Sequence, residues 1–211
     1  ELTAEAAGRV YPVEKWTSVS FSSMAMGYEV AVTPLQIAAA GAAIANKGVY
    51  NGATILKGIQ DQYMKEPVKD SKNGSRRVVS ANAANQVKRC MVRALKEGGT
   101  GTNAAIPGYT IAGKTGTARK HVENVGYVNG KYIVSFLGFF PADDPKILGL
   151  VVIDEPKADG VHLYGGTVAA PVFKKMAEKA IKLMGIAPDV PEEIEALRAE
   201  EALELSQNIA E

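Results

Sequence analysis

Residues 109–118 read YTIAGKTGTA, a short apolar run that leads directly into Lys114-Thr115-Gly116-Thr117. The β-branched and aromatic residues at its start predict a strand. The ammonium and hydroxyl groups that follow could both bind a substrate carboxylate, and the glycine would let a substrate backbone approach the strand edge. Main-chain N–H groups exposed at such an edge can stabilise an oxyanion. The stretch therefore predicts an anion-binding strand edge, although the tripeptide alone would also fit a turn with a solvated lysine.

The residues after this stretch predict further strands. Residues 127–132 (YVNGKY) contain Asn-Gly, which favours a two-residue type I′ turn, so we expect a hairpin there. Ile133 to Phe140 and Ile147 to Ile153 are apolar enough to be central strands of a sheet. Because the connection over residues 141–145 is short, neighbouring strands should be antiparallel.

Residues before the stretch predict a first helix and a short strand. Thr33 as N-cap, Pro34 at the first helical position and Gln36 at the third fit a capping box, and the helix should run to about Lys47. Its run of alanine and isoleucine leaves almost no polar face, which predicts burial on most sides. A short strand is expected around Thr54-Ile55-Leu56.

Two further helices are expected from helical spacing of apolar residues. Ser80 should cap the second, whose apolar face would be Ala84, Val87, Met91, Ala94 and Leu95. The last should run from about Ala170 to Met184, with an apolar face of Phe173, Met176, Ala177, Ala180, Ile181 and Met184. Amphipathic helices of this kind are typical of layers that cover one side of a sheet.

The composition indicates one ordinary globular domain. The chain has 211 residues, of which 46% are hydrophobic and 22% charged. Its longest apolar run, Ile37 to Ala45, is too short to cross a bilayer. It begins at Glu1 with neither methionine nor a signal-peptide pattern, so we expect an internal piece of a longer protein.

Cysteine and histidine usage predicts neither a metal site nor a cofactor. The single cysteine, Cys90, excludes an intrachain disulfide framework and a cysteine-rich zinc site. His121 and His162 show no metal-ligand spacing. A Cys-His nucleophilic pair remains possible, but Cys90 lies among apolar positions of an expected helix, which favours a buried structural thiol.

Charge is distributed unevenly along the chain. The net charge is +1, yet residues 186–211 hold eight acidic groups and one basic group and so carry −7, which leaves +8 on residues 1–185. The positive charge on residues 1–185 could suit an anionic partner such as a polymer with free carboxylates. Lysines and arginines on solvated helix faces would explain the same charge equally well. We expect residues 1–187 to form the domain and residues 188–211 an acidic tail, loosely helical or disordered.

Motifs over roughly residues 16–185 resemble class B penicillin-binding proteins in order and spacing. The matching stretches are VTPLQIA (32–38), IANKG (44–48), AGKTGTA (112–118), SFLGFFP (135–141), VIDEP (152–156), YGG (164–166) and AAPVF (169–173). Lys-Thr-Gly is itself a signature of penicillin-binding proteins and β-lactamases. The resemblance implies an α+β fold with a five-stranded antiparallel sheet flanked by helices, of which this chain would be the C-terminal portion.

The resemblance also implies a function. A serine would attack the penultimate D-Ala carbonyl of a peptidoglycan stem peptide, and an amine of a second stem would then take the acyl group. Lys114 would belong to the polar network around the nucleophile and attract the substrate carboxylate, and Thr115 would hydrogen-bond that carboxylate. Gly116 would keep the edge open, and the main-chain N–H of Thr117 would form half of the oxyanion hole. β-Lactams would acylate the same serine because they mimic D-Ala-D-Ala.

The resemblance further implies a protein anchored in the bacterial cytoplasmic membrane, with this domain on the outer side. Its partners would be stem peptides, β-lactams and other cell-wall synthesis proteins, with no nucleic acid and no cofactor.

One departure from the family pattern is large. The family requires Ser-x-x-Lys, and no serine of this chain has a lysine three positions later. Ser-x-Asn occurs at residues 71–73, 80–82 and 206–208, none of them before the Thr33 helix where the family places it. The chain therefore contains no nucleophile and should be inactive alone. A β-lactam sensor, a D-Ala carboxypeptidase, a β-lactamase or a non-enzymatic interaction fragment remain alternatives.

Overall fold

A three-stranded antiparallel sheet forms the centre of the protein. The computed structural model describes residues 5–55, 58, 60, 63, 74–122, 126–157 and 162–210. The strands are β5 (Ala112–Val122), β6 (Gly126–Phe140) and β7 (Ile147–Asp154), in the order β5-β6-β7. The antiparallel arrangement and the α+β class are confirmed.

The apolar sequence of β7 does not make it a central strand. Among the described residues β7 pairs only with β6, so it lies at one edge of the sheet and β5 at the other. Helices contact β7 on both faces of the sheet, which accounts for its apolar residues.

Four two-residue strands form separate pairs. β1 (Arg9–Val10) pairs with β2 (Val30–Ala31), and β3 (Val49–Tyr50) pairs with β4 (Arg76–Arg77). The strand expected around Thr54-Ile55-Leu56 is wrong for its first two residues, which are irregular, and Leu56 lies outside the described residues. The strand in this region is instead β3, which comes earlier, directly after the first long helix. Between β1 and β2 lie a 3₁₀ turn (Val13–Lys15) and helix α1 (Ser20–Ala25).

The hairpin expected at Asn129-Gly130 is also wrong. β6 continues through both residues, and the β5–β6 connection lies earlier, between Val122 and Gly126. The pairing register shifts here: Arg119 lies opposite Tyr132 and His121 opposite Tyr127. The extra residues of β6 therefore form a bulge. Gly130 has a φ of 79°, and a left-handed glycine suits a bulge as well as a turn, so the dipeptide alone could not distinguish them.

The three expected helices are present. They are α2 (Pro34–Ala45), α3 (Ala81–Arg93) and α4 (Ala170–Met184), the last preceded by a π-helical turn (Gly165–Ala169). The capping box of α2 is confirmed: the Gln36 N–H donates to Thr33 Oγ1 at 3.2 Å, and the Thr33 N–H donates to Gln36 Oε1 at 2.9 Å. The Ala83 N–H likewise donates to Ser80 Oγ at the start of α3.

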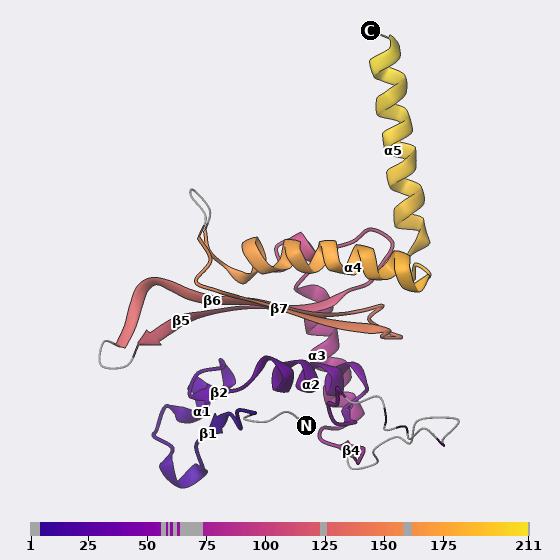
Figure 1. Ribbon diagram of the computed structural model, residues 1–211. Helices are drawn as coiled ribbons and strands as arrows, with labels where there is room; N and C mark the ends of the chain where they lie inside the picture. The colour runs from indigo at the N-terminus through magenta and orange to yellow at the C-terminus, as the bar shows by residue number, and fades with distance from the viewer. Residues whose placement is uncertain are drawn as a thin grey trace.

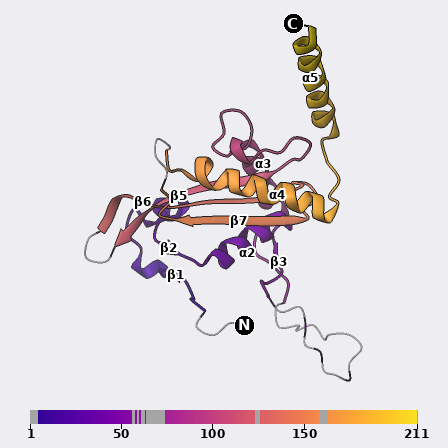
Figure 2. The ribbon, with the colours of Figure 1, turned by 45° about the horizontal axis from the view of Figure 1, so that its top comes forward.

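Helices α4 and α2 cover opposite faces of the sheet (Figure 1), and the tilted view in Figure 2 shows the same layers. On the α4 side, the Phe173 ring is 2% exposed and its centroid lies 4.8 Å from that of Phe136. On the α2 side, Gly41 brings the helix against Leu137, whose Cδ1 lies 2.8 Å from where a Cβ at that glycine would be. The core therefore consists of two apolar layers separated by the sheet.

Several side chains expected to be buried are exposed. On α2 only Gly41 and Ala43 are buried, and Leu35 is 44% exposed, because the contacts of this helix with the sheet, α3 and β3 leave part of its surface exposed. On α3, Val87 and Cys90 are exposed, since the buried positions Ala84 and Met91, with Leu95 just after the helix, follow a narrower stripe than expected. The prediction of a buried thiol is therefore wrong.

On α4, Phe173 and Ala177 are buried as expected, with Ala180 and Ile181 packed against the core. Met176 is 56% exposed and Met184 59%, so they were wrongly placed on the buried face. The apolar face of this helix is wider than the surface that contacts the sheet, so the residues at its margins stay exposed.

The acidic C-terminal residues begin with contacts to the loop that precedes β5. The Thr110 N–H donates to Asp189 Oδ1 at 2.8 Å, and the Gly108 N–H donates to Glu193 Oε2 at 3.1 Å. The Tyr109 hydroxyl donates to the main-chain oxygen of Ile186, and burial, together with the nearby Asp189 carboxylate, raises the pKa of Tyr109. Helix α5 (Pro191–Ala210) then extends away from the layers (Figure 1). No helix in the described part of the chain has the length and apolar character needed to span a membrane.

Candidate functional site at the β5 edge

Lys114, Thr115, Gly116 and Thr117 lie in the first half of β5, whose far side pairs with no strand among the described residues. In an antiparallel edge strand, every second residue turns its N–H and C=O away from the single partner strand. The four residues singled out from the sequence are therefore brought together on a free edge. Such an edge is open to pairing with an extended peptide.

The side chains of Thr115 and Lys114 begin on opposite faces of the sheet. Thr115 lies opposite Phe136, which packs on α4, and Lys114 lies opposite Leu137, which packs on α2. Directly opposite residues of an antiparallel pair share a face, so Thr115 and Thr117 belong to the α4 face and Lys114 to the α2 face. The exposed Lys114 ammonium still reaches the strand edge, where Nζ donates to the main-chain oxygen of Thr115 at 2.6 Å.

Two neighbouring segments orient the threonine hydroxyls. Thr115 Oγ1 lies 3.0 Å from Thr100 Oγ1, and the Gly165 N–H donates to Thr117 Oγ1 at 3.1 Å. Because that N–H uses a lone pair of Thr117 Oγ1, the hydroxyl proton is left to donate elsewhere. An anion at this edge would therefore meet a hydroxyl donor from Thr117, with the Lys114 charge nearby.

Two glycines allow close contacts in this part of the sheet. A Cβ at Gly116 would collide with the Ser135 hydroxyl on β6. A Cβ at Gly165 would collide with the main-chain oxygen of Ser135 and lie 2.5 Å from that of Gly116. The turn that contains Gly165 thus rests directly on the backbones of β5 and β6. This contact explains how its N–H reaches Thr117.

The supporting residues around the threonines were missed by sequence reasoning. Thr100 follows a glycine-rich loop and has no local pattern that points to Thr115. Asn103 donates through Nδ2 to the Gly166 main-chain oxygen at 2.9 Å, which joins that loop to the turn before α4. The signal that could have found the turn was the Gly165-Gly166 pair, since adjacent glycines indicate close approach of backbones.

A charged cluster fixes the other half of β5. Lys120 Nζ lies 2.8 Å from Asp154 Oδ2 and 2.9 Å from Glu155 Oε1, both at the end of β7. The hydrogen bonds that Lys120 donates to Asp154 and then to Glu155 raise the pKa of Lys120, and the bond that Glu155 accepts from Lys120 lowers the pKa of Glu155. Lys131 adds a second cation 3.6 Å from Glu155. The cluster links both outer strands across β6.

No set of three or more His, Cys, Asp or Glu side chains that could hold a metal ion occurs within the described part of the chain. The chemistry that the β5 edge itself offers is hydrogen bonding and charge: one ammonium, two hydroxyls and free main-chain groups.

Comparisons with known proteins agree with the resemblance noted in the sequence. The family model described as the penicillin binding protein transpeptidase domain matches residues 1–178. Stage V sporulation protein D of Bacillus subtilis is 37% identical over 189 residues, which cover 89% of this chain and 29% of that protein. The peptidoglycan D,D-transpeptidase FtsI of Escherichia coli is 35% identical, covering 89% of this chain and 30% of that protein.

Solved structures give the same family. The transpeptidase domain of Burkholderia pseudomallei penicillin-binding protein 3 superimposes with a TM-score of 0.74 at 34% identity, over 88% of this chain and 53% of that chain. Penicillin-binding protein 3 of Mycobacterium tuberculosis in complex with aztreonam gives 0.79 at 29% identity, over 90% of this chain and 43% of that chain. The chain thus spans about a third of those curated relatives and about half of those solved chains. On the family match and these likenesses, the chain belongs to the penicillin-binding protein transpeptidase family.

Proposed function

We propose that this chain supplies the substrate-binding strand of a peptidoglycan D,D-transpeptidase of class B. The serine of a Ser-x-x-Lys segment, which this sequence does not contain, bonds to the penultimate D-Ala carbonyl carbon. The peptide C–N bond to the terminal D-Ala breaks, and the departing nitrogen takes a proton. The amine of a second stem peptide then attacks the ester, forms the cross-linking amide and returns the serine hydroxyl.

The single observation that carries the proposal is the free β5 edge with Thr115, Thr117 and Lys114 along it. The two hydroxyls and the ammonium receive the terminal carboxylate, Gly116 leaves the edge open, and the main-chain N–H of Thr117 forms half of the oxyanion hole. Because Lys114 starts from the face covered by α2, the nucleophile approaches β5 from that side. The exposed side of α2 is consistent with cover by the segment that brings it.

The remaining roles follow from the same assignment. β-Lactams acylate the same serine, the protein is anchored in the cytoplasmic membrane with this domain outside, and other cell-wall synthesis proteins are its partners. We divide the chain into residues 1–187, as the C-terminal part of the transpeptidase domain, and an acidic tail of residues 188–211. The support for this division is that α5 extends away from the layers beyond its first turn, where Glu193, like Asp189 before the helix, is bonded to the loop at Gly108–Thr110.

Fluorescent penicillin tests the proposal on two samples, the 211-residue chain and the complete gene product that contains it. The complete product should take up one equivalent and the chain alone none. In the complete product, Lys114→Ala should slow acylation by about a hundredfold or more, the loss typical of a group that acts on a proton or a developing charge. Lys131→Ala is the matched control, since it removes a cation of β6 that pairs with Glu155 and is not one of the residues Lys114–Thr117, and it should leave the rate unchanged.

Stoichiometric labelling of the isolated chain, or an unchanged rate in Lys114→Ala, would refute the assignment. The products distinguish the alternatives within the same superfamily. Rapid release of hydrolysed penicillin identifies a β-lactamase, and free D-Ala without cross-linked peptide identifies a carboxypeptidase. Stable labelling without any reaction of peptide donors identifies a sensor.

A further inference from the structure

Residues 186–194, which we call the C-terminal segment, are hydrogen-bonded to the loop that leads into β5. The N–H groups of Asp189 and Val190 both donate to the main-chain oxygen of Gly108 at 3.1 Å. The Gly108 N–H in turn donates to Glu193 Oε2 at 3.1 Å. Because the C-terminal segment uses both main-chain groups of Gly108, it holds the backbone of this loop directly.

Thr110 in the same loop is held from two sides. Its N–H donates to Asp189 Oδ1 at 2.8 Å, and its main-chain oxygen accepts from the Ala142 N–H at 2.8 Å, just after β6. Tyr109 adds a bond from its hydroxyl to the main-chain oxygen of Ile186 at 2.8 Å. A hydrogen bond to a carboxylate is charge-assisted and about twice as strong as a neutral one. We therefore expect Asp189 to contribute most to holding Thr110 in place.

Gly108 lets the first turn of α5 come close to the loop. A Cβ at this residue would lie 2.5 Å from Cδ1 of Ile194, and its φ of 83° is one that glycine adopts freely. Lys96, just after α3, lies 4.0 Å from Glu193 and adds an ion pair to the same contact. The contact thus combines a small residue on the loop with carboxylates and an apolar side chain on the C-terminal segment.

The loop at residues 108–110 leads directly into the strand that carries the site. Only Ile111, which is 3% exposed, separates Thr110 from Ala112, the first residue of β5. Lys114 follows two residues later. A strand advances about 3.4 Å per residue, so Thr110 lies about 14 Å from Lys114 along the chain. A displacement of the loop is therefore transmitted to β5 with little chain in between to absorb it.

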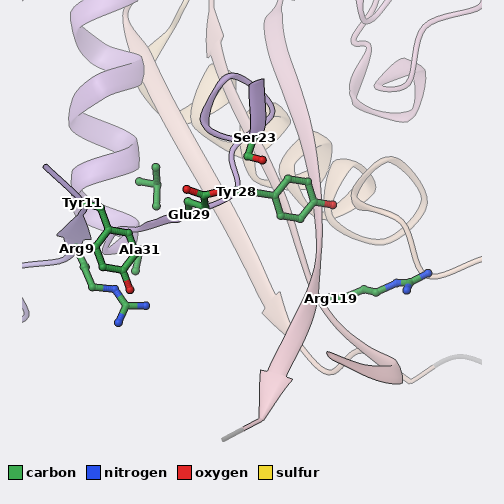
Figure 3. A pocket seen from close by; sticks show the side chains of 8 residues that line it. Arg9, Tyr11, Ser23, Tyr28, Glu29, Ala31 and Arg119 are labelled. Carbon is green, nitrogen blue, oxygen red and sulfur yellow. The ribbon is translucent and has the colours of Figure 1, made fainter. Parts of the chain in front are cut away.

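The far half of β5 is held less directly. Lys120 pairs with Asp154 and Glu155 through a flexible four-carbon side chain, which leaves the strand backbone free to move. Next to it, Arg119 and, from the segment between α1 and β2, Tyr28 line a hollow of about 770 Å³ (Figure 3). Among the described residues β5 also pairs with no strand except β6. The placement of its edge therefore depends strongly on how its start is held.

We propose that Asp189 and Glu193 are positioning residues of the transpeptidase site, an inference that rests on the proposed function. By holding residues 108–110 they fix the start of β5, and with it the placement of residues 114–117 against the serine. In this role they act through β5 and not on the substrate. The C-terminal segment lies beyond residues 1–178, which match the family model, so the family pattern assigns it no role.

Acylation of the complete gene product by fluorescent penicillin tests this role. Asp189→Ala removes the acceptor of the Thr110 N–H and should lower the second-order rate constant by about tenfold. A displacement of about 1 Å in an active site can cost about a hundredfold, and the remaining bonds to the loop limit the shift. Asp189→Asn keeps an Oδ1 acceptor and should recover most of the rate. Glu193→Ala should cause a smaller loss, since the Gly108 main-chain oxygen stays bonded to Asp189 and Val190.

Amide hydrogen exchange distinguishes positioning from a general loss of stability. In Asp189→Ala the amides of residues 110–113 should exchange faster, while those of α3 keep their protection, because only the start of β5 is released. Ser80→Ala is the matched control, since it also removes a side-chain acceptor of a main-chain N–H, that of Ala83 at the start of α3. It should lower the melting temperature at least as much as Asp189→Ala and leave the acylation rate unchanged.

An unchanged acylation rate in Asp189→Ala would overturn the inference. Equal losses in Asp189→Ala and Asp189→Asn would overturn it too, because the effect would then follow the charge and not the bond to Thr110. A loss in Ser80→Ala as large as that in Asp189→Ala would assign the effect to overall stability. If the unmodified complete product takes up no penicillin, the proposed function fails and this inference fails with it.

Discussion

Replacing Gly165 by alanine should destabilise the protein more than replacing Gly116, although both glycines lie at the β5 edge. The new methyl at position 165 would meet only backbone: the main-chain oxygens of Ser135 and Gly116, the latter at 2.5 Å, and the Gly116 nitrogen at 3.0 Å. Strand backbone cannot rotate away, so β5, β6 or the turn must shift. Overpacking of this kind costs about 1–3 kcal/mol.

Alanine also recovers about 0.5–1 kcal/mol relative to glycine, because it restricts the unfolded chain. The net loss for Gly165→Ala should therefore be at most about 2.5 kcal/mol, which lowers the melting temperature of a domain of this size by up to about 10 °C. The methyl in Gly116→Ala would meet the Ser135 hydroxyl, which can rotate about one bond. Its change in unfolding free energy should stay within about 0.5 kcal/mol.

Thermal and urea unfolding of the two variants would measure the difference. The double variant Gly116→Ala/Ser135→Ala is the matched control, since it removes the hydroxyl and should abolish any remaining clash. A Gly165→Ala protein as stable as the wild type, beside a Gly116→Ala protein that loses more than about 1 kcal/mol, would show that the turn does not rest on the sheet as described.

Two further predictions concern the core and the charged cluster. Phe173→Ala should lower the free energy of unfolding by about 3–5 kcal/mol in urea, because the ring of this α4 residue is buried against Phe136. Met176→Ala, the exposed control on the same helix, should lower it by less than about 1 kcal/mol. Equal losses in the two variants would contradict the assignment of this face of α4 to the core. The lowered pKa of Glu155 gives stability that is present above its ordinary value of 4.5 and is lost as the pH falls through the lower folded value. The raised pKa of Lys120 gives stability that is present below 10.5 and is lost as the pH rises through its folded value. Glu155→Gln should therefore flatten the acid side of a plot of urea midpoint against pH, and Glu14→Gln should not; an acid side as steep as that of the wild type would refute the pairing with Lys120.

Local signals in the sequence determined the features that depend on near neighbours. The capping box at Thr33 and Gln36 joins residues three apart, so propensity and spacing are enough to predict it. The strand that carries Lys114-Thr115-Gly116 and the apolar strands after it were predicted for the same reason. The motif series along the chain is sufficient to indicate the family.

Only the tertiary structure decided which surfaces meet. Sequence periodicity gives the apolar width of a helix but not the width of its contact, so Met176 and Cys90 were placed wrongly. Asn129-Gly130 satisfies both a turn and a bulge, and the pairing of two strands selected the bulge. The support of Thr115 by Thr100 and of Thr117 by Gly165, and the bonds of Asp189 and Glu193 to the loop before β5, join residues far apart in the chain. Such contacts follow from packing of whole layers, which no local pattern records.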